Sequence, residues 1–511
     1  AHQPIPDPLW SRGLGDVYKR QDVMGNVERI ELAPGLEISR VLTGLWQVAD
    51  MERDGGVVDT AAAAAEMRRY VETGLTTFDM ADHYGSSEVI AGHFAAGAPD
   101  EAQFLTKWVP KPGPHSPEDV RTAVETARSR LQADTIDVLQ FHAWSYSDPA
   151  WLDCMFYLQD LRDEGLIRHL ALTNADTAHL RMLLDSGIEI VSNQVSYSLL
   201  DRRAAGAMAE LCGERGVKIL AFGTVAGGFF SERWLGVAEP RMDQLETWSQ
   251  MKYKRFIDVA GGWARYQELL QTLGRASERL GVSIANVACR CMLEAPSVGG
   301  IIIGARLGQS EHIEETLGLF GFEIDADSRA EIDAAVAEFD AIPGDCGDEY
   351  RTPPFLTAAG DLSDHFDEAP APYPVVEGPG DRTRALSGTV WEDLAGFSRA
   401  VRKGDRIFIS GTTATHRERL IGGTDAGSQA HFCLDKIEGA IQSLGGTLDN
   451  VVRTRVYVAN ADDAGAVTRV HGVRLGHVQP ANTLVLTGLV GDGYLVEIEA
   501  EAVIDVGDPC I

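Results

Sequence analysis

The sequence predicts an α/β protein with two folded parts: a closed (β/α)8 barrel, the TIM-barrel architecture, and a smaller α+β domain after it. Three observations lead to this prediction. The chain of 511 residues is too long for one ordinary hydrophobic core. From residue 40 onward, short apolar runs alternate with segments of helical spacing, and eight such units fill roughly 300 residues. This alternation stops in an acidic, proline-rich stretch, and the pattern beyond it is typical of a different fold class, α+β.

The elements of the first part are expected in strict alternation. The strand-like runs are Val41–Val48, Thr76–Met80, Phe104–Trp108, Ile136–Phe141, His169–Leu172, Ile190–Gln194, Lys218–Phe222 and Gly300–Ile303. The helical segments are Ala61–Glu72, Glu88–Phe94, Glu118–Leu131, Trp151–Asp163, Thr177–Leu184, Ala204–Arg215, Ser283–Leu293 and Ser310–Leu319. Such alternation gives parallel strands with right-handed crossovers, and a barrel of this kind carries its active site at the carboxyl ends of the strands. A doubly wound sheet is the alternative, but Thr43–Gln47 lacks the Gly-rich turn that usually follows its first strand.

A linker separates the two parts. The acidic stretch from Pro343 to Pro379 contains seven prolines, which is typical of a linker. Its first segment, Asp345–Arg351, could fold back over the barrel mouth. The second part is expected to contain strands and helices in a mixed order: Arg406–Ser410, Ala430–Leu444, Val451–Val458, Ala464–Leu475, Thr483–Leu486 and Tyr494–Val503. The predicted ranges are a non-native or disordered leader at 1–23, the barrel at 24–345, the linker at 346–381 and the second domain at 382–511.

Composition excludes several classes of partner. The formal charge of −31 argues against nucleic acid and anionic membranes, because phosphate groups would repel such a surface. No stretch approaches the roughly 20 unbroken apolar residues that a membrane-spanning helix needs. The seven cysteines are scattered without a CxxC pair, so reduced thiols, a cytoplasmic location and no metal site are expected. The leader has no apolar region of the kind found in signal peptides, and Met24 is interpreted as the natural start.

Four chemically active side chains stand at or just past the ends of three successive predicted strands. Asp79 and Tyr84 lie in the segment Phe78–Gly85, Lys107 comes from the next strand, and His142 follows the one after that. A tyrosine has an ordinary pKa of about 10, but a neighbouring ammonium lowers it, and a carboxylate keeps that ammonium charged and oriented. The set predicts an acid catalyst in which Tyr84 protonates a carbonyl oxygen that accepts hydride, while His142 polarises that oxygen.

These motifs resemble those of the aldo-keto reductase family, and the resemblance extends from residue 30 to residue 345. Phe78-Asp79, Asp82-His83-Tyr84-Gly85, Leu105-Thr106-Lys107 and His142 match the family's catalytic Asp, Tyr, Lys and His. The resemblance implies a nicotinamide cofactor. Thr173-Asn174 and Gln194 stand where the family contacts the carboxamide, and Phe222 stands where an aromatic ring stacks on the nicotinamide.

The choice between the two nicotinamide dinucleotides is also implied by the resemblance. Gly304-Ala305-Arg306 resembles the family's 2′-phosphate segment, which implies NADPH, with NADH possible. Glu315 matches the family pattern, whereas His312 stands where Gln or Arg is usual and Thr316 replaces the common Asn. The substrate pocket is expected to be aromatic, and the insertion 224–262 is expected to cover the cofactor. The candidate pocket residues are Trp46, Trp108, Trp144 and Tyr146.

The second part, from residue 385 to residue 508, resembles the Rid family, the reactive intermediate deaminases also called YjgF-like, with a chorismate-mutase-like fold. The matching segments are Phe397–Val401, which contains Arg399, Ile407–Thr413, Asn450–Val458 and Val496–Ala500. The resemblance implies a trimer with clefts between subunits, where active members hydrolyse enamines or imines. Asn482 replaces the family's arginine, whose planar guanidinium binds a substrate carboxylate through two hydrogen bonds. Glu497 stands where the family has the glutamate that activates water.

The predicted function is therefore an NADPH-dependent oxidoreductase that reduces an aldehyde or ketone and assembles as a homotrimer, or binds a ligand, through its Rid-like domain. Two alternatives stay open. One is a bifunctional enzyme that reduces a carbonyl and also deaminates an enamine or imine. The other is a scaffold that binds the cofactor and turns over poorly, which the presence of Tyr84 and Lys107 argues against.

Overall fold

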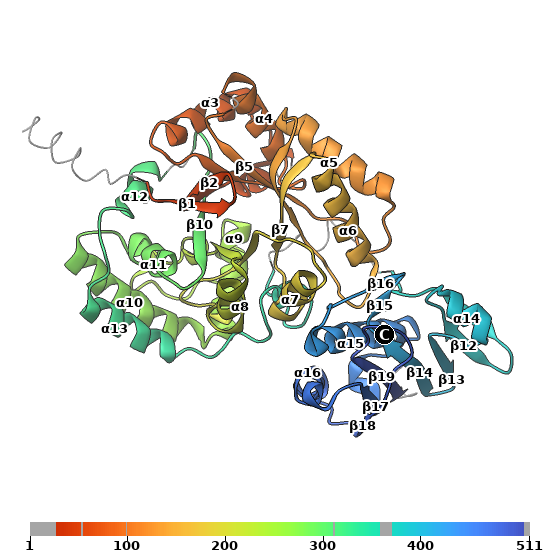
Figure 1. Ribbon diagram of the computed structural model, residues 1–511. Helices are drawn as coiled ribbons and strands as arrows, with labels where there is room; N and C mark the ends of the chain where they lie inside the picture. Colours follow the sequence, from red (N-terminus) through yellow and green to blue (C-terminus); the bar gives the residue numbers. More distant parts are fainter. Residues whose placement is uncertain (1–26, 53–54, 99, 310–311, 358–369, 505–511) are drawn as a thin grey trace, which may run out of the picture.

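The computed structural model describes residues 27–52, 55–98, 100–309, 312–357 and 370–504 of the chain. The predicted leader at 1–23 lies outside these residues. Figure 1 shows a barrel, coloured red to green along the chain, and a smaller domain in blue that packs against its side. Among the helices of the described ranges, none combines the length and the apolar character that crossing a bilayer requires.

Eight parallel strands close into the predicted (β/α)8 barrel, in the order β10-β3-β4-β5-β6-β7-β8-β9. The strands are β3 Val41–Gly44, β4 Thr77–Asp79, β5 Gln103–Trp108, β6 Ile136–Phe141, β7 Ile167–Thr173, β8 Ser192–Ser196, β9 Lys218–Phe222 and β10 Val298–Gly304. The ring closes because β10 pairs in parallel with both β9 and β3. All eight carboxyl ends therefore open on the same side of the barrel.

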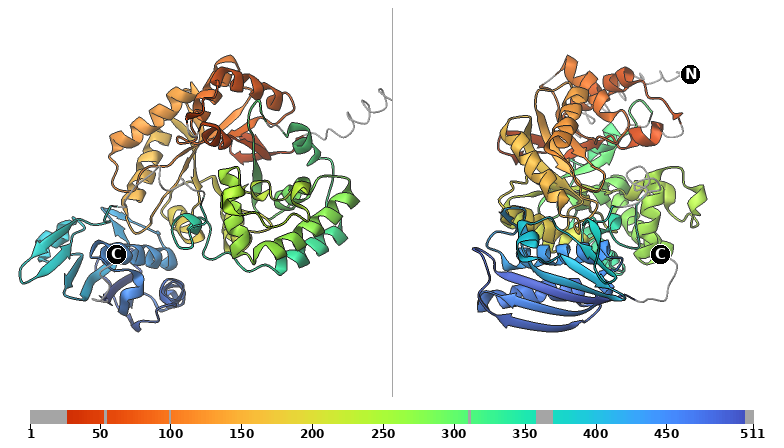
Figure 2. Two further views of the ribbon diagram at one scale, coloured as in Figure 1. Left: turned by 180° about the vertical axis from the view of Figure 1, so that it is seen from behind. Right: turned by 90° about the vertical axis from the view of Figure 1, so that its right-hand side faces the viewer.

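Helices surround the barrel, as both views in Figure 2 show. They are α2 Gln47–Glu52, α3 Thr60–Val71, α4 Ser87–Gly97, α5 Pro117–Leu131, α6 Ala150–Asp163, α7 Thr177–Asp185, α8 Ala207–Arg215, α9 Trp248–Val259, α10 Gly262–Leu280, α11 Ile284–Leu293, α12 Ile313–Gly318 and α13 Ala326–Ala337. Their starts follow local sequence: Ser116, for example, forms a capping box with Asp119 at the start of α5, with Pro117 at the first helical position.

An antiparallel hairpin that the sequence does not predict precedes the barrel. Strands β1 Arg29–Ala33 and β2 Leu36–Ser39 pair with each other immediately before β3 begins. Their apolar side chains form one buried cluster with inward-facing residues of the barrel strands: Leu32, Leu36, Ile38, Leu42, Leu105, Val138, Ala171 and Leu220. The hairpin therefore closes the amino-terminal end of the barrel, opposite the strand ends that carry the predicted chemistry.

Several element boundaries differ from those predicted. The first strand ends at Gly44 rather than Val48, because the chain turns into α2. Strand β8 begins two residues later than predicted, since its buried sequence Ser192–Ser196 is mostly polar and an apolar run is a poor guide to it. Helix α8 begins at Ala207 rather than at Ala204, after a short 3-10 turn at Arg203–Ala205. Helices α9, α10 and α13 are absent from the prediction.

The second domain is a seven-stranded mixed sheet with helices on one face. The sheet order is β11-β12-β13-β14-β19-β17-β18, in which only β17 and β18 pair in parallel. Its elements are β11 Val375–Gly378, β12 Arg382–Ala385, α14 Val390–Ala395, β13 Ala400–Lys403, β14 Arg406–Thr413, α15 Ala426–Ser443, β17 Val451–Val458, α16 Ala464–Leu475, β18 Ala481–Leu486 and β19 Val496–Val503, with a small hairpin of β15 Thr415–His416 and β16 Arg419–Leu420. The predicted linker range 346–381 thus contains β11, so the sheet begins before residue 382.

The two folded parts share a close interface. Helix α7 of the barrel packs on α15 of the second domain, as Figure 1 shows. Asp153 on α6 accepts from His416 Nε2 at 2.8 Å and from Arg417 Nη2 at 2.9 Å. Gly439 lies so near the barrel that a Cβ there would be 2.1 Å from the Ser147 carbonyl oxygen. The backbone of α15 therefore packs closely against the barrel at Gly439.

Candidate active site

The four predicted catalytic side chains come together at the carboxyl ends of β4, β5 and β6. Lys107 Nζ donates to Asp79 Oδ2 at 2.7 Å and to the Met80 carbonyl oxygen at 3.0 Å. The same ammonium lies 4.7 Å from the centroid of the Tyr84 ring. His142 Nδ1 lies 3.3 Å from the Thr173 carbonyl oxygen on the neighbouring strand. All four side chains line one cavity.

Two glutamines extend this polar cluster across the barrel. Gln140 Nε2 donates to Asp79 Oδ1 at 3.1 Å, and Gln194 Nε2 donates to the same oxygen at 2.6 Å and to Gln140 Oε1 at 2.9 Å. Gln140 is absent from the predicted site, although it precedes His142 by two residues and so shares its side of the strand. The amide of Gln194, predicted to contact a carboxamide, is thereby hydrogen-bonded to the predicted catalytic carboxylate of Asp79.

The buried ion pair has a definite electrostatic character. Lys107 and Asp79 are both 3% exposed. Burial lowers the pKa of Lys107, and the Asp79 carboxylate opposes that shift. The pair is therefore sensitive to any loss of the carboxylate, because desolvation favours the neutral amine.

A cavity of about 490 Å³ opens over these residues, within the usual size of small-molecule sites. Every predicted cofactor residue lines it: Thr173, Asn174, Gln194, Phe222, Gly304, Arg306, His312, Glu315 and Thr316. Of the predicted pocket aromatics, Trp46 and Trp144 also line it. Trp46 packs against Trp248 at the start of α9, with ring centroids 6.2 Å apart.

Trp108 and Tyr146, also predicted to line the pocket, do not. Trp108 follows Lys107 on β5, and successive side chains of a strand point to opposite sides. Since Lys107 points into the barrel mouth, Trp108 packs outside it against Phe141. Tyr146 stacks on His179, with ring centroids 3.4 Å apart, beneath the interface with the second domain.

One end of the cavity carries charged groups suited to phosphate. Arg306 is bound by the carboxylate of Asp50 and donates to Gln47 Oε1 at 3.4 Å. His312 Nδ1 lies 3.2 Å from Glu315 Oε2, and this hydrogen bond raises the pKa of His312. Arg306 and His312 thus each already have a carboxylate partner.

The insertion after β9, predicted to cover a cofactor, forms a further wall of the cavity. Gly227 and Gly228 line the cavity together with Ser231 and Arg233. A Cβ at Gly227 would lie 2.7 Å from the Ser249 carbonyl oxygen, so only glycine permits this close approach of the loop to α9. A backbone cradle, nearby arginines and the amide groups of Asn174 and Gln194 are a donor set that fits an elongated dinucleotide.

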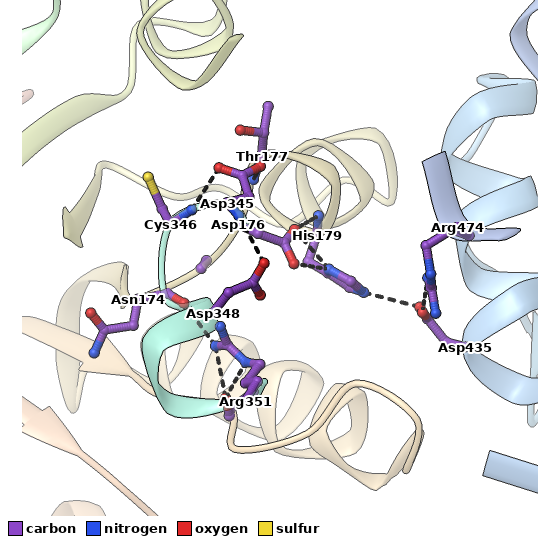
Figure 3. Close-up of polar contacts among 12 residues, drawn as sticks. Asn174, Asp176, Thr177, His179, Asp345, Cys346, Asp348, Arg351, Asp435 and Arg474 are labelled. Atoms are coloured by element: carbon purple, nitrogen blue, oxygen red, sulfur yellow. Dashed lines mark hydrogen bonds and ion pairs between the residues drawn. The ribbon is translucent and has the colours of Figure 1, made fainter. Parts of the chain in front are cut away.

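The segment Asp345–Arg351, here called the strap, lies across the barrel mouth, where the sequence allows it to fold. Figure 3 shows Arg351 reaching two strand-end loops at once. Its guanidinium donates to the Ala143 carbonyl oxygen at 2.8 and 3.0 Å and to the Asn174 carbonyl oxygen at 2.7 Å. Thr177 N donates to Asp345 Oδ2 at 3.0 Å, which fixes the other end of the strap.

The strap supplies a residue that the predicted site lacks. Tyr350, in the 3-10 turn Asp348–Tyr350, lines the cavity. Its ring centroid lies 5.5 Å from that of His142 and 6.1 Å from that of Trp144. Lys252 on α9 donates to the Tyr350 hydroxyl at 2.6 Å. No local sequence signal marks Lys252 and Tyr350, because their meeting depends on how α9 and the strap pack.

In the second domain, two of the three predicted cleft residues are neighbours and the third is not. Burial raises the pKa of Glu497, and Arg399 opposes that shift. Arg399 donates to the Gly411 carbonyl oxygen at 2.9 Å, and a Cβ at Gly411 would lie 2.1 Å from Glu497 Oε1. Asn482 instead accepts from Thr454 Oγ1 at 3.2 Å. Because Thr454 belongs to the helix-covered side of β17, Asn482 is turned away from Glu497 within one chain.

Comparison with known proteins agrees with this two-part architecture. The sequence profile of the aldo/keto reductase family matches residues 40–337, and that of the endoribonuclease L-PSP family matches residues 391–504. The NADH-specific methylglyoxal reductase of Escherichia coli is 27% identical over 269 residues, which are 47% of this chain and 82% of that protein. An uncharacterized protein of Streptomyces coelicolor, SCO2049, is 38% identical over 120 residues, which are 23% of this chain and 90% of that protein.

Solved structures cover the same two regions. Glycerol dehydrogenase AKR11B4 from Gluconobacter oxydans matches with a TM-score of 0.52 and 21% identity, over 62% of this chain and 98% of that one. Rv2704 from Mycobacterium tuberculosis, a member of the YjgF/YER057c/UK114 family, matches with 38% identity and a TM-score of 0.22, over 24% of this chain and 99% of that one. The first likeness concerns the barrel fold alone.

Proposed function

Since this chain belongs to the aldo/keto reductase family and carries a YjgF/Rid domain after its barrel, we propose that it is an NADPH-dependent oxidoreductase that reduces an aldehyde or a ketone. The observation that carries the proposal is the buried Lys107–Asp79 ion pair, at 2.7 Å, with its ammonium 4.7 Å from the Tyr84 ring centroid. An ammonium beside a phenol stabilises the phenolate and so makes the phenol a better acid.

In the proposed reaction, the Tyr84 hydroxyl donates its proton to the carbonyl oxygen, and His142 donates a hydrogen bond to the same oxygen. Asp79 holds Lys107 charged and in place, and Gln140 and Gln194 hold Asp79. The reduced nicotinamide would supply the hydride. Trp46, Trp144 and Tyr350 line the cavity and limit the access of water.

The residues that would hold the cofactor are those that line the cavity from the strand ends to Arg306. Thr173, Asn174, Gln194 and Phe222 suit the nicotinamide and its carboxamide, and Arg306, His312, Glu315 and Thr316 suit the adenosine end. Arg306 and His312 favour a 2′-phosphate and hence NADPH. Their pairing with Asp50 and Glu315 favours NADH as the alternative, and the ratio of kcat/KM for the two cofactors decides between them.

Replacing the proposed acid tests the function. In Tyr84→Phe the ring stays and the proton donor goes, so kcat for aldehyde reduction should fall by about 10²- to 10⁴-fold. The affinity for NADPH, measured by fluorescence titration, should stay within a factor of about two, because the ring still fills its place. Tyr157→Phe, on α6 and away from the cavity, is the matched control. Equal rates in Tyr84→Phe and the parent protein would remove Tyr84 as the acid.

We propose that the second domain assembles three copies of the chain. All six residues of β18 are exposed, and the sheet face opposite α15 and α16 carries exposed Phe408 and Val485 beside the Arg455–Glu499 ion pair. An open sheet face with apolar and paired charged groups is suited to subunit contact. Light scattering of the full chain should give three times the chain mass of 55.3 kDa, and a monomer at micromolar concentration would contradict assembly.

Enamine or imine hydrolysis is the alternative role for this domain. Arg399 and Glu497 favour it by their proximity, whereas Asn482 offers no charge to a substrate carboxylate. Semicarbazide trapping of enamine breakdown separates the two roles. Robust activity that Glu497→Ala abolishes would establish a deaminase.

A further inference from the structure

Lys252 is a buried cation at the edge of the active-site cavity. It lies on α9, is 4% exposed and lines the cavity. Its Nζ donates to the Tyr350 hydroxyl at 2.6 Å and lies 5.0 Å from the centroid of the Phe222 ring. Tyr350 belongs to the strap and Phe222 ends β9, so two segments other than α9 contact this one ammonium.

No carboxylate of the described residues forms an ion pair with Lys252. Two acidic groups of the strap and of the loop after β8 are held by Arg203, which binds Asp201 at 2.7 Å and Glu349 at 2.8 Å. Lys254, two residues further along α9, shows the contrast, because it is also buried but pairs with Glu239 and Asp258. A buried ammonium whose partners are a neutral hydroxyl and an aromatic face lacks the anion that would normally offset its desolvation.

The position of Lys252 separates it from the phosphate end of the cavity. Ser249, one turn earlier on α9, bonds to Gln47, and Gln47 accepts from Arg306. Lys252 instead reaches Tyr350, whose ring lies against those of His142 and Trp144. Helix α9 therefore spans the cavity, with its first turn near the proposed adenosine end and Lys252 one aromatic ring away from the proposed catalytic histidine.

We propose that Lys252 binds a carboxylate on the substrate, so that the preferred substrates are aldehyde or ketone acids and the products are hydroxy acids. The inference rests on the proposed reductase function. One ammonium matches one carboxylate charge, and the Tyr350 hydroxyl can donate to the second carboxylate oxygen. The nicotinamide is a poor partner for Lys252, since its ring is cationic in the oxidised state and an ammonium would repel it.

The test compares acids with neutral compounds of nearly the same size. The substrates are straight-chain ω-oxo acids of two to six carbons and their methyl esters, with NADPH oxidation as the readout on the full chain. In the parent protein, kcat/KM should favour the best acid over its ester by about 10- to 100-fold, the worth of one charge-assisted hydrogen bond. Lys252→Met should remove most of that preference through KM, with the ester rate and the affinity for NADPH nearly unchanged.

Two further variants make the result specific. Lys252→Arg keeps the charge and should keep a preference for the acid, which a purely structural role for Lys252 does not require. Lys254→Met, on the same helix but outside the cavity, should leave the acid-to-ester ratio at the parent value. An equal loss of acid and ester reduction in Lys252→Met, or a loss of NADPH affinity measured by fluorescence, would overturn the proposal.

Failure of the inference is distinguishable from failure of the proposed function. If the parent protein reduces esters and acids equally well, the enzyme is a reductase and Lys252 does not select carboxylates. If it reduces neither in the presence of NADPH or NADH, the proposed reductase function itself is wrong.

Discussion

At the scale of single residues, the site depends on a charge pair that the barrel buries. Asp79 accepts from Lys107, Gln140 and Gln194, so its two oxygens together take three hydrogen bonds. Lys107 donates to Asp79 and to the Met80 carbonyl oxygen, and its ammonium faces Tyr84. Burial and the carboxylate act on the Lys107 pKa in opposite directions, and in the proposed mechanism the balance between them sets how well Lys107 acidifies the Tyr84 phenol.

Removing the carboxylate charge should therefore change the pH dependence of catalysis. In Asp79→Asn the attraction that raises the Lys107 pKa is lost while the burial that lowers it stays. The ammonium should then lose its proton at a lower pH, so the alkaline limb of the kcat/KM profile should move toward neutrality. Steady-state rates with one aldehyde between pH 6 and 10 measure this shift.

A neighbouring carboxylate provides the control for this variant. Glu88 is also buried and accepts from Thr106 on the same strand, at 2.5 Å, but it does not contact Lys107. Glu88→Gln should leave the alkaline limb where it is. An unchanged limb in Asp79→Asn would mean that Lys107 does not govern the acidity of the site.

At the scale of elements, the strap converts an open barrel mouth into a bounded cavity. Arg203 binds its backbone at Asp345 and its side chain at Glu349, both at 2.8 Å. Gly347 lies directly over the end of β7, where a Cβ would be 1.9 Å from the Asn174 carbonyl oxygen. Asn174, a residue of the proposed nicotinamide site that the strap contacts, has a φ of 57°, in the left-handed region.

Gly347→Ala should displace the strap and weaken binding at the mouth. Its methyl group cannot coexist with the Asn174 carbonyl oxygen, so Tyr350 and Asn174 must both move. We expect KM for the carbonyl substrate and the Kd for NADPH each to rise by about 10-fold, equivalent to about 1.4 kcal/mol. Steady-state kinetics and fluorescence titration measure the two changes.

Gly281 separates the effect of this contact from that of backbone conformation. It ends α10 with a φ of 70°, close to the 82° of Gly347, but a Cβ there would meet nothing within 4 Å. Gly281→Ala should cost about 1–2 kcal/mol of unfolding free energy from the left-handed backbone and leave KM and Kd unchanged. Equal kinetics in both variants would show that the strap tolerates displacement.

At the scale of the whole molecule, a buried histidine joins the barrel to the second domain. His179 on α7 contacts Asp176 at 2.7 Å on one side and Asp435 on α15 at 3.0 Å on the other, as Figure 3 shows. Asp435 is also bound by Arg474 at 2.6 Å, and the Tyr146 ring stacks on His179. Burial opposes protonation of His179, but the two carboxylates outweigh it and raise its pKa to about 9.

The stability of the docked protein should therefore fall as the pH rises. The His179 pKa lies above its ordinary value of 6.5, so its contribution is complete below about pH 6.5 and is lost as the pH passes through 9. Over this pH window, the free energy of unfolding in urea should fall more for the parent chain than for His179→Gln. The difference should be on the order of 3 kcal/mol. Comparing the two proteins cancels other titrating groups, such as Lys436, whose pKa burial lowers to about 8. The same pH dependence in both proteins would remove His179 as the cause.

Below this window, stability depends on the ionisation of the two carboxylates that contact His179. The pKa values of Asp176 and Asp435 are lowered by the charge of His179 against the effect of burial, so their contribution is present above pH 4 and is lost in acid. The interface is accordingly most stable in mildly acidic to neutral solution.

Sequence reasoning succeeded where the placement of elements and side chains depended on spacing along the chain. The alternation of strands and helices predicts the barrel, and the ends of β4, β5 and β6 bring Asp79, Lys107 and His142 to one mouth because parallel strands share a direction. It failed at β8, whose polar residues are buried in the barrel, and at Trp108, whose position after Lys107 turns it outward.

The sequence by itself thus determined the two-part architecture, the family resemblances and the four side chains of the proposed acid catalyst. Local periodicity and short motifs are enough to specify all of these. Only the tertiary structure decided the boundary of the pocket, the pairing of Lys252 with Tyr350 and the His179 bridge between the two folded parts. Lys252 and Tyr350 are 98 residues apart, and His179 and Asp435 are 256 apart. Such contacts arise from how separate elements pack, which no local pattern of residues encodes.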